Sequence, residues 1–202
     1  MRIGIDFDNT IVSYDALFHK VAREQGVVPP NTPANKLAVR DYLRQIGKED
    51  LWTEMQGYVY GERMDEANAY AGVIEFIRLA DQAGHKLAII SHKTKHPILG
   101  KKCDLHAAAR SWVDRHLCTE DERLIPANQV FFELTKEDKL TRISALGCDV
   151  FVDDLPEILT SPAFPKSARR ILFDPEDHHR DADTSNCVVC KSWNEIEGIL
   201  IA

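Results

Sequence analysis

Short apolar runs alternate with stretches of helical periodicity along most of the chain. The runs are rich in β-branched and aromatic residues, and they predict strands at 3–5, 87–90, 130–134, 150–152 and 171–173, with a weaker sixth at 187–190. Between them, apolar residues recur every three or four positions at 73–80 and 105–116, as in helices with one buried face. This alternation predicts an α/β fold, a doubly wound and mostly parallel sheet with helices on both faces.

Two further helices have recognisable starts. Thr135 is placed to cap a helix with Asp138 three residues on, and Gly147 is placed to end it. Ser192, followed three residues later by Glu195, predicts a last helix in the same way. Each of these helices comes directly after a predicted strand, so both fit the βαβ pattern.

The interval 13–71 breaks this rhythm, because its helical periodicity is not interrupted by a long strand. Apolar residues predict one helix near 14–21 and another near 39–46, and a loop with three prolines separates them. We therefore expect a small helical cap at 13–71, inserted after the first strand. The core would consist of 1–12 and 72–202.

Composition narrows the functions that suit this fold. The 202 residues, 44% of them hydrophobic, suffice for one well-packed core and a modest insertion. The net charge of -7 should repel polyanions, so we expect no nucleic-acid partner and a small diffusible substrate instead. We also expect no membrane association and a cytoplasmic location. The reasons are that no apolar run approaches the roughly 20 residues of a bilayer span, the N-terminus is unlike a signal peptide, and the five cysteines lack disulfide-scaffold spacing.

Carboxylates follow two of the predicted strands at the point where each strand ends. Asp6 and Asp8 follow the first strand, and Asp153 and Asp154 follow the run at 150–152. One acid in such a place is more commonly a turn residue or a helix cap. Two strands that end this way favour a ligand site, because open α/β sheets bind ligands beyond the carboxyl ends of their strands. Four clustered carboxylates need a cation among them, and oxygen ligands suit Mg²⁺.

The order of these short motifs resembles the haloacid dehalogenase (HAD) superfamily. D-x-D-N-T begins at Asp6, Ser91 follows the strand at 87–90, a lysine lies at a helix start, and D-D ends at Asp154. The resemblance covers the core and leaves the cap uncovered. It implies the phosphatase branch, because the dehalogenases of the superfamily lack the second acid and the metal. The implied enzyme is a magnesium-dependent phosphomonoester hydrolase that acts on a small metabolite, a sugar phosphate or a nucleotide.

The resemblance also implies a role for each motif residue. Asp6 would be the nucleophile that forms an aspartyl-phosphate, and Asp8 would act as general acid and then as general base. Ser91 would donate a hydrogen bond to a phosphoryl oxygen, and Lys136 or Lys139 would offset the charge that develops there. Lys136 is preferred, because it lies in the first turn of its helix directly after the strand.

The metal ligands implied by the resemblance are Asp6, the backbone carbonyl of Asp8, and Asp153 or Asp154. The sequence leaves open which of the last two contacts Mg²⁺ directly.

Substrate contacts are expected from residues that adjoin the motifs, namely Asn9, Thr10 and His92. His92 opens a cationic stretch at 92–97 that could meet an anionic substrate at the rim of the site. A solvated basic loop is the simpler interpretation of that stretch.

Three other functions remain open. The D-x-D motif also forms the metal site of sugar-nucleotide glycosyltransferases, although here it ends the first predicted strand. A polynucleotide 3'-phosphatase shares the motif layout, but the acidic composition disfavours a polynucleotide. A non-catalytic phosphate-binding module would not need a nucleophile, an acid–base group and a lysine together.

Overall fold

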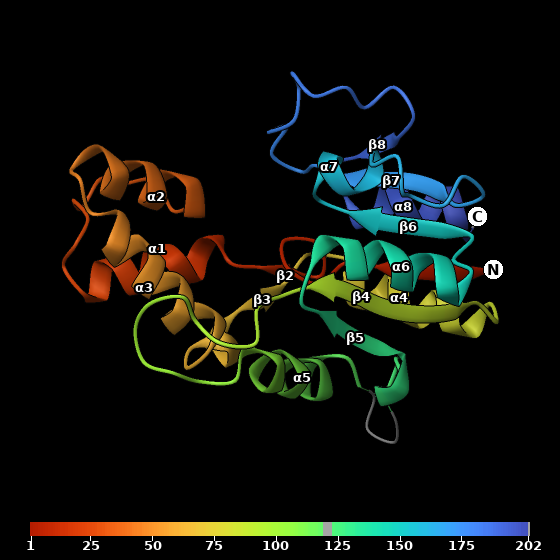
Figure 1. Cartoon of the computed structure of the whole chain (residues 1–202), viewed down its shortest axis with the longest axis horizontal. Coiled ribbons are helices and arrows are strands. Elements are labelled where there is room, and N and C mark those ends of the chain that lie inside the picture. Colours follow the sequence, from red (N-terminus) through yellow and green to blue (C-terminus); the bar gives the residue numbers. More distant parts are fainter. Residues whose placement is uncertain (119–122, 202) are drawn as a thin grey trace. The chain divides into compact units, whose positions relative to one another are not determined.

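The computed structural model describes residues 1–118 and 123–201 (Figure 1). The chain divides into two compact units. The core unit comprises Met1–Val12, Ala69–Lys93 and Leu117–Ala202, and the helical unit comprises Ser13–Asn68 and Thr94–His116.

A six-stranded parallel sheet is the centre of the core unit. Its strands are β1 (Arg2–Ile5), β4 (Lys86–His92), β5 (Val130–Glu133), β6 (Val150–Asp153), β7 (Arg169–Phe173) and β8 (Val188–Cys190). They lie in the order β5-β4-β1-β6-β7-β8, which is 3-2-1-4-5-6 along the chain. This order is typical of doubly wound folds, so the expected fold class is confirmed. Strand order reverses between β1 and β6, and ligands of such sheets bind beyond the strand ends at that point.

Helices cover both faces of this sheet. They are α4 (Val73–Gln82), α6 (Lys136–Leu146), α7 (Pro156–Leu159) and α8 (Trp193–Leu200). On one face, Ile143 of α6 and Ile158 of α7 pack in a buried cluster with Phe151 of β6. On the other face, the Trp193 ring of α8 lies 5.0 Å from Phe76 of α4 and 5.6 Å from Phe173 of β7, measured between centroids.

The helix that follows β5 begins and ends where the sequence predicts. The Thr135 hydroxyl accepts a hydrogen bond from the Asp138 amide at 3.0 Å, which satisfies one of the free N–H groups of the first turn. Gly147 ends the helix in the left-handed region with φ 62°. The Ser192 cap of α8 has the same form, with the Glu195 amide 3.2 Å from the hydroxyl.

The helical unit is built from four α-helices and a short 3₁₀ helix in its described residues. These are α1 (Asp15–Glu24), α2 (Lys36–Gln45), α3 (Glu49–Tyr60), η1 (Met64–Glu66) and α5 (Leu105–His116). The helices predicted near 14–21 and 39–46 are confirmed as α1 and α2. The shorter elements elsewhere are β2 (Val12–Ser13), β3 (Asn68–Ala69) and η2 (Ala127–Gln129).

One segment groups differently from the expected division. Residues 94–116 belong to the helical unit, whereas the sequence had assigned all of 72–202 to the core. Local contacts explain this, because the Trp112 indole of α5 donates a hydrogen bond to the Ala67 carbonyl at 2.9 Å. A Cβ on Gly57 of α3 would lie 2.7 Å from Pro97, so the absence of a side chain there admits the segment before α5.

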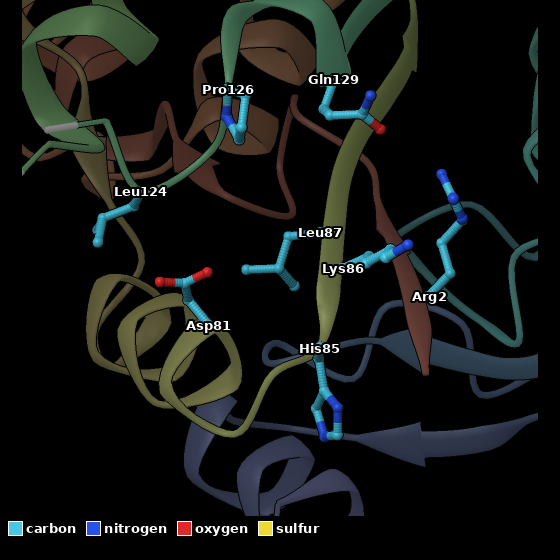
Figure 2. A pocket seen from close by; sticks show the side chains of 8 residues that line it. All are labelled: Arg2, Asp81, His85, Lys86, Leu87, Leu124, Pro126 and Gln129. Atoms are coloured by element: carbon cyan, nitrogen blue, oxygen red, sulfur yellow. The ribbon is translucent and has the colours of Figure 1, made fainter.

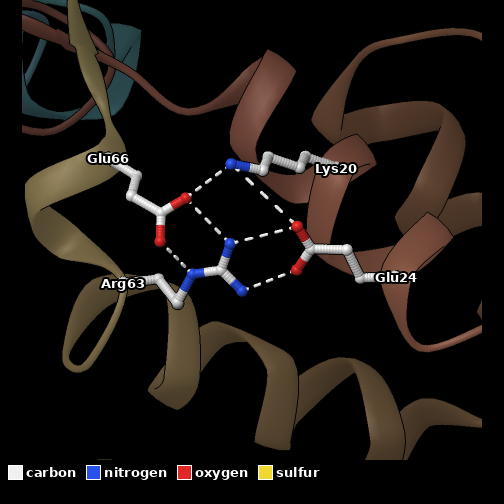
Figure 3. Close-up of polar contacts among 4 residues, drawn as sticks. All are labelled: Lys20, Glu24, Arg63 and Glu66. Atoms are coloured by element: carbon white, nitrogen blue, oxygen red, sulfur yellow. Dashed lines mark hydrogen bonds and ion pairs between the residues drawn. The ribbon is translucent and has the colours of Figure 1, made fainter.

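An ion-pair cluster joins α1 to η1 within the helical unit. Arg63 lies between Glu24 and Glu66 and hydrogen-bonds to both, and Lys20 lies 2.8 Å from Glu66 (Figure 3). Hydrogen bonds from Arg63 and Lys20 lower the pKa of Glu66 to about 2. Arg63 is largely covered, but Lys20, Glu24 and Glu66 are exposed to solvent. Each single ion pair therefore adds little to the stability of the fold, and a contribution comes from the network as a whole.

In the described part of the chain, no helix combines the length and the apolar character that a membrane span requires.

Candidate active site

Three carboxylates meet at the carboxyl ends of β1 and β6. Asp6 directly follows β1, Asp153 is the last residue of β6, and Asp154 comes next. The Asp6 amide donates to the Val152 carbonyl at 2.9 Å, which links the two strands at this point. One oxygen from each of the three carboxylates lies within 4.8 Å of the others. The sheet therefore brings together acids that are almost 150 residues apart in sequence.

Lys139 neutralises part of this cluster. Its Nζ lies 2.6 Å from Asp6 Oδ1 and 2.7 Å from Asp153 Oδ2, and all three side chains are buried. Burial alone would lower the pKa of Lys139, but the carboxylates of Asp153 and Asp6 outweigh it and raise that pKa. Lys139 is therefore charged and shared between two acids.

The sequence favours Lys136 as the lysine beside the nucleophile, but in the structure it is Lys139 that contacts Asp6. Lys136 extends outward and pairs with Glu157 at 2.6 Å, with 41% of its side chain exposed. The helix start was predicted correctly, and the difference comes from the direction of the side chains. A helical side chain points back toward the N-terminus, so a long lysine one turn further along reaches the strand ends.

Burial dominates the electrostatics of Asp6. Removal from water raises the pKa of Asp6 to about 6, with Lys139 opposing the shift and Asp153 adding to it. Asp6 is therefore ionised at neutral pH, although at a cost to the folded protein.

Asp8 lies apart from the other carboxylates and has its own cation. Lys93 Nζ lies 2.8 Å from Asp8 Oδ1 and 2.7 Å from Asp8 Oδ2. Lys93 is buried, with 6% of the residue exposed, so the interpretation of 92–97 as a solvated basic loop is wrong for Lys93. Sequence reasoning did not identify Lys93 as a site residue, although its place just past a strand was a usable signal.

Ser91 and His92 are the last residues of β4, and β1 lies between β4 and β6 in the sheet. Ile5 pairs with Ile89, so Ser91 lies two residues beyond that pair, at the same sheet edge as Asp6. Ser91 is buried. His92 is partly buried, and burial together with the nearby Lys139 ammonium lowers the pKa of its imidazole. A neutral imidazole at pH 7 therefore adjoins the site.

Asn9 and Thr10 lie in the tight loop after β1. The amides of Ile11 and Val12 both donate to the Phe7 carbonyl, and Asn9 has the left-handed φ of 58° that asparagine tolerates better than most residues. Thr10 is fully buried, and its hydroxyl has no hydrogen-bond partner among residues 1–118 and 123–201. Asp8 belongs to the same stretch of chain, two residues after Asp6.

The composition of the cluster fits a hard divalent cation. The cluster together with Asp8 has four carboxylates and the ammonium groups of Lys93 and Lys139, which gives a net charge of −2 when all six groups are ionised. The potential donors of the three-carboxylate cluster, Asp6, Asp153 and Asp154, are all oxygen atoms, the ligands that Mg²⁺ prefers. A single divalent cation would bring this charge to zero.

A cavity of about 320 Å³ opens at the opposite edge of the same sheet (Figure 2). It is lined by Arg2 and Lys86, the first residues of β1 and β4, and by His85 and Asp81 among others. None of the acids after β1 and β6 lines it. The carboxylate cluster therefore lies outside this cavity.

Solved structures with this architecture cover nearly the whole chain. A predicted phosphatase from Clostridium acetobutylicum is similar with a TM-score of 0.62 and 13% identity over 99% of this chain and 97% of that one. A HAD family hydrolase from Deinococcus radiodurans, solved with bound phosphate and sodium, is similar with a TM-score of 0.56 and 16% identity over 98% and 94%. A HAD-superfamily hydrolase from Ehrlichia chaffeensis is similar with a TM-score of 0.57 and 13% identity over 98% of this chain and 95% of that one.

The chain has the HAD fold. The fold that the motif resemblance implies is thus confirmed. No family model matches the sequence. Among curated proteins, a candidate nucleotidase of Oceanobacillus iheyensis is 20% identical over 189 residues, which is 90% of each chain. The carboxylates and Lys139 converge at the carboxyl ends of the strands, where open α/β sheets bind their ligands.

Proposed function

We propose that this chain is a metal-dependent phosphomonoester hydrolase with Asp6 as the nucleophile. The observation that carries the proposal is the buried Lys139, whose ammonium lies between Asp6 and Asp153 at the switch point of the sheet. Structures that share the fold include hydrolases and phosphatases, which supports the same reaction class. Burying charged groups costs the fold stability. Such a cluster is therefore better explained by a role in catalysis than by a role in folding.

The residues divide the work between two steps. In the first, an Asp6 oxygen attacks phosphorus and Asp8 gives a proton to the leaving oxygen. In the second, water attacks the aspartyl-phosphate and Asp8 takes a proton from that water. Ser91 donates a hydrogen bond to the phosphoryl group, and Lys139 offsets its charge.

Mg²⁺ is the cation we propose for the carboxylate cluster, held by Asp6, Asp153 or Asp154, and the backbone carbonyl of Asp8. Bound there, it would offset negative charge on the substrate phosphate. The protein supplies oxygen donors, Lys139 to balance the remaining charge, and burial that excludes bulk water.

The substrate we propose is a small phosphorylated metabolite, either a nucleotide or a sugar phosphate. Similarity to a candidate nucleotidase supports the nucleotide, and the net charge of -7 argues against a polynucleotide. We further propose that residues 13–71 act as a cap that limits the size of the substrate, with Asn9, Thr10 and His92 as the substrate contacts nearest the motifs.

A phosphate-release assay tests the proposal. The purified chain is incubated with Mg²⁺ and a panel of nucleoside monophosphates, sugar phosphates and 4-nitrophenyl phosphate, with Asp6→Asn as the matched control. We expect release of inorganic phosphate by the wild type and a loss of at least about a thousandfold in the variant. Equal rates for the two proteins would exclude Asp6 as the nucleophile. A wild type inactive on the entire panel would favour a binding module.

A further inference from the structure

The ion pair between Lys93 and Asp8 differs from the surface pairs of this chain. Only 5% of the Lys93 side chain and 21% of the Asp8 side chain is exposed, and one ammonium group contacts both carboxylate oxygens. The Lys93 amide also donates to the Glu133 carbonyl at 2.7 Å, which fixes the backbone just past β4. The ammonium is thus held from a rigid strand end.

Stability alone does not account for this pair. Taking two charges out of water costs free energy, and apolar side chains of the same size are often as stable in such places. A buried pair at a site is therefore better explained by what it does to the carboxylate. Contact with both oxygens fixes the rotation of the carboxylate.

We propose that Lys93 is a positioning residue that holds Asp8 ready for the second step of the reaction. This inference rests on the proposed function. In that step, water oxygen bonds to phosphorus while the bond from phosphorus to the Asp6 oxygen breaks, and its electron pair returns to the Asp6 carboxylate. One water proton passes to an Asp8 oxygen. Lys93 keeps its own protons throughout, and inorganic phosphate is the product.

The role predicts an effect on one step. Asp8 must be an oriented carboxylate to take the proton from water, so the loss of Lys93 slows hydrolysis of the aspartyl-phosphate. With 4-nitrophenyl phosphate the leaving group departs without a proton, so formation of the aspartyl-phosphate does not need Asp8 as an acid. Lys93→Met should therefore let phosphorylated enzyme accumulate.

The experiment is rapid-mixing kinetics with 4-nitrophenyl phosphate and Mg²⁺, measuring the burst of 4-nitrophenolate and the amount of acid-trapped phosphoenzyme. The variants are Lys93→Met, Lys93→Gln, which keeps a hydrogen-bond donor, and Lys95→Met as the matched control. Lys95 is an exposed lysine two residues on, and its Nζ lies 3.9 Å from Asp104. Melting of each protein in Mg²⁺ checks that it is folded.

We expect Lys93→Met to keep the burst while steady turnover falls by about tenfold or more, with more phosphoenzyme and a lower KM. Lys93→Gln should fall between Lys93→Met and the wild type, and Lys95→Met should match the wild type. Unchanged turnover in a folded Lys93→Met protein overturns the inference. A raised KM without accumulation would make Lys93 a substrate contact, and equal loss of burst and turnover would make its role structural. A wild type that forms no phosphoenzyme would instead overturn the proposed function.

Discussion

The ammonium of Lys139 lies 2.6 Å from Asp6 Oδ1, although the two residues are 133 positions apart in sequence. The same ammonium contacts Asp153, so a single lysine links the ends of β1 and β6. Charge balance, metal binding and packing can therefore be changed at one point of the sheet by single substitutions.

Replacing Lys139 should remove most activity, and replacing Lys136 should not. The Lys139 ammonium is buried beside the nucleophile, and loss of a preorganised cation in such a site costs about 3 to 4 kcal/mol of transition-state stabilisation. We expect Lys139→Ala to lower kcat/KM at least about a hundredfold and Lys136→Ala less than about fivefold, measured with 4-nitrophenyl phosphate. The matched lysines lie on one helix three residues apart. Equal losses would show that position in the helix, and not contact with Asp6, decides the role.

The charge balance of the cluster gives a second prediction, for stability. Lys139→Met keeps the apolar stem but leaves Asp6 and Asp153 facing each other, which should destabilise the metal-free protein by about 3 to 5 kcal/mol. Mg²⁺ should recover part of this loss, because a cation again lies among the acids. Thermal melting in chelator and in millimolar Mg²⁺ measures both effects. A variant as stable as the wild type in chelator would show that the ion pairs of Lys139 with Asp6 and Asp153 do not stabilise the fold.

The fold was predictable because its signals are local. The apolar runs, the Thr135 and Ser192 caps and Gly147 each depend on residues within a few positions of one another, and the structure confirms them. The acids were predictable for the same reason, since each lies at the end of a strand or within three residues of it.

The two lysines were harder to place from the sequence, because their positions depend on tertiary geometry. Choosing between Lys136 and Lys139 requires the direction of side chains on a docked helix. Recognising Lys93 requires knowing that the residue just past β4 is covered, while its neighbours Thr94 and Lys95 are exposed. A run of basic residues has the same appearance in sequence whether one of them is buried or none is.

Metal binding can be tested without activity. Mg²⁺ bound only to the folded protein raises its stability by about 2.7 kcal/mol at a hundred times the dissociation constant, so it should raise the melting temperature of the wild type. Asp153→Asn should abolish most of that rise. Asp149→Asn is the control, because Asp149 precedes β6 at the other edge and accepts a hydrogen bond from the Arg2 amide. A rise that survives in Asp153→Asn but disappears in Asp149→Asn would place the metal elsewhere.

Gly4 of β1 gives a prediction about the packing beneath the site. A Cβ at this position would lie 2.6 Å from Phe151 Cδ2, so Gly4→Ala forces the ring to move and should cost about 1 to 3 kcal/mol. Gly198 of α8 is the matched control, because nothing lies within 4 Å of its added Cβ and alanine favours a helix by about 0.5 to 1 kcal/mol. Denaturant unfolding compares the two. The packing argument fails if Gly4→Ala is as stable as the wild type.

Asp6 itself should make the metal-free protein less stable at neutral pH than at acid pH. Its pKa rises from 3.8 in the unfolded chain to about 6 in the fold, mainly through burial. Below about pH 3.8 the carboxyl is protonated in both states and adds no cost. As the pH rises toward 6, the unfolded chain loses the proton first, so stability falls, and above 6 the cost reaches about 3 kcal/mol.

Asparagine resembles the protonated acid and should remove this cost. In chelator, Asp6→Asn should therefore be more stable than the wild type by up to about 3 kcal/mol at pH 7.5 and by about 1 kcal/mol at pH 4.5, measured by urea unfolding. Lys139 keeps its contact with Asp153 in the variant, so no buried ammonium is left alone. The exposed Asp181→Asn is the control and should show no such pH dependence. In Mg²⁺ the advantage should shrink, because the cation favours the ionised wild-type carboxylate. An Asp6→Asn protein that is less stable than the wild type at pH 7.5 in chelator would mean that Lys139 outweighs burial at this site.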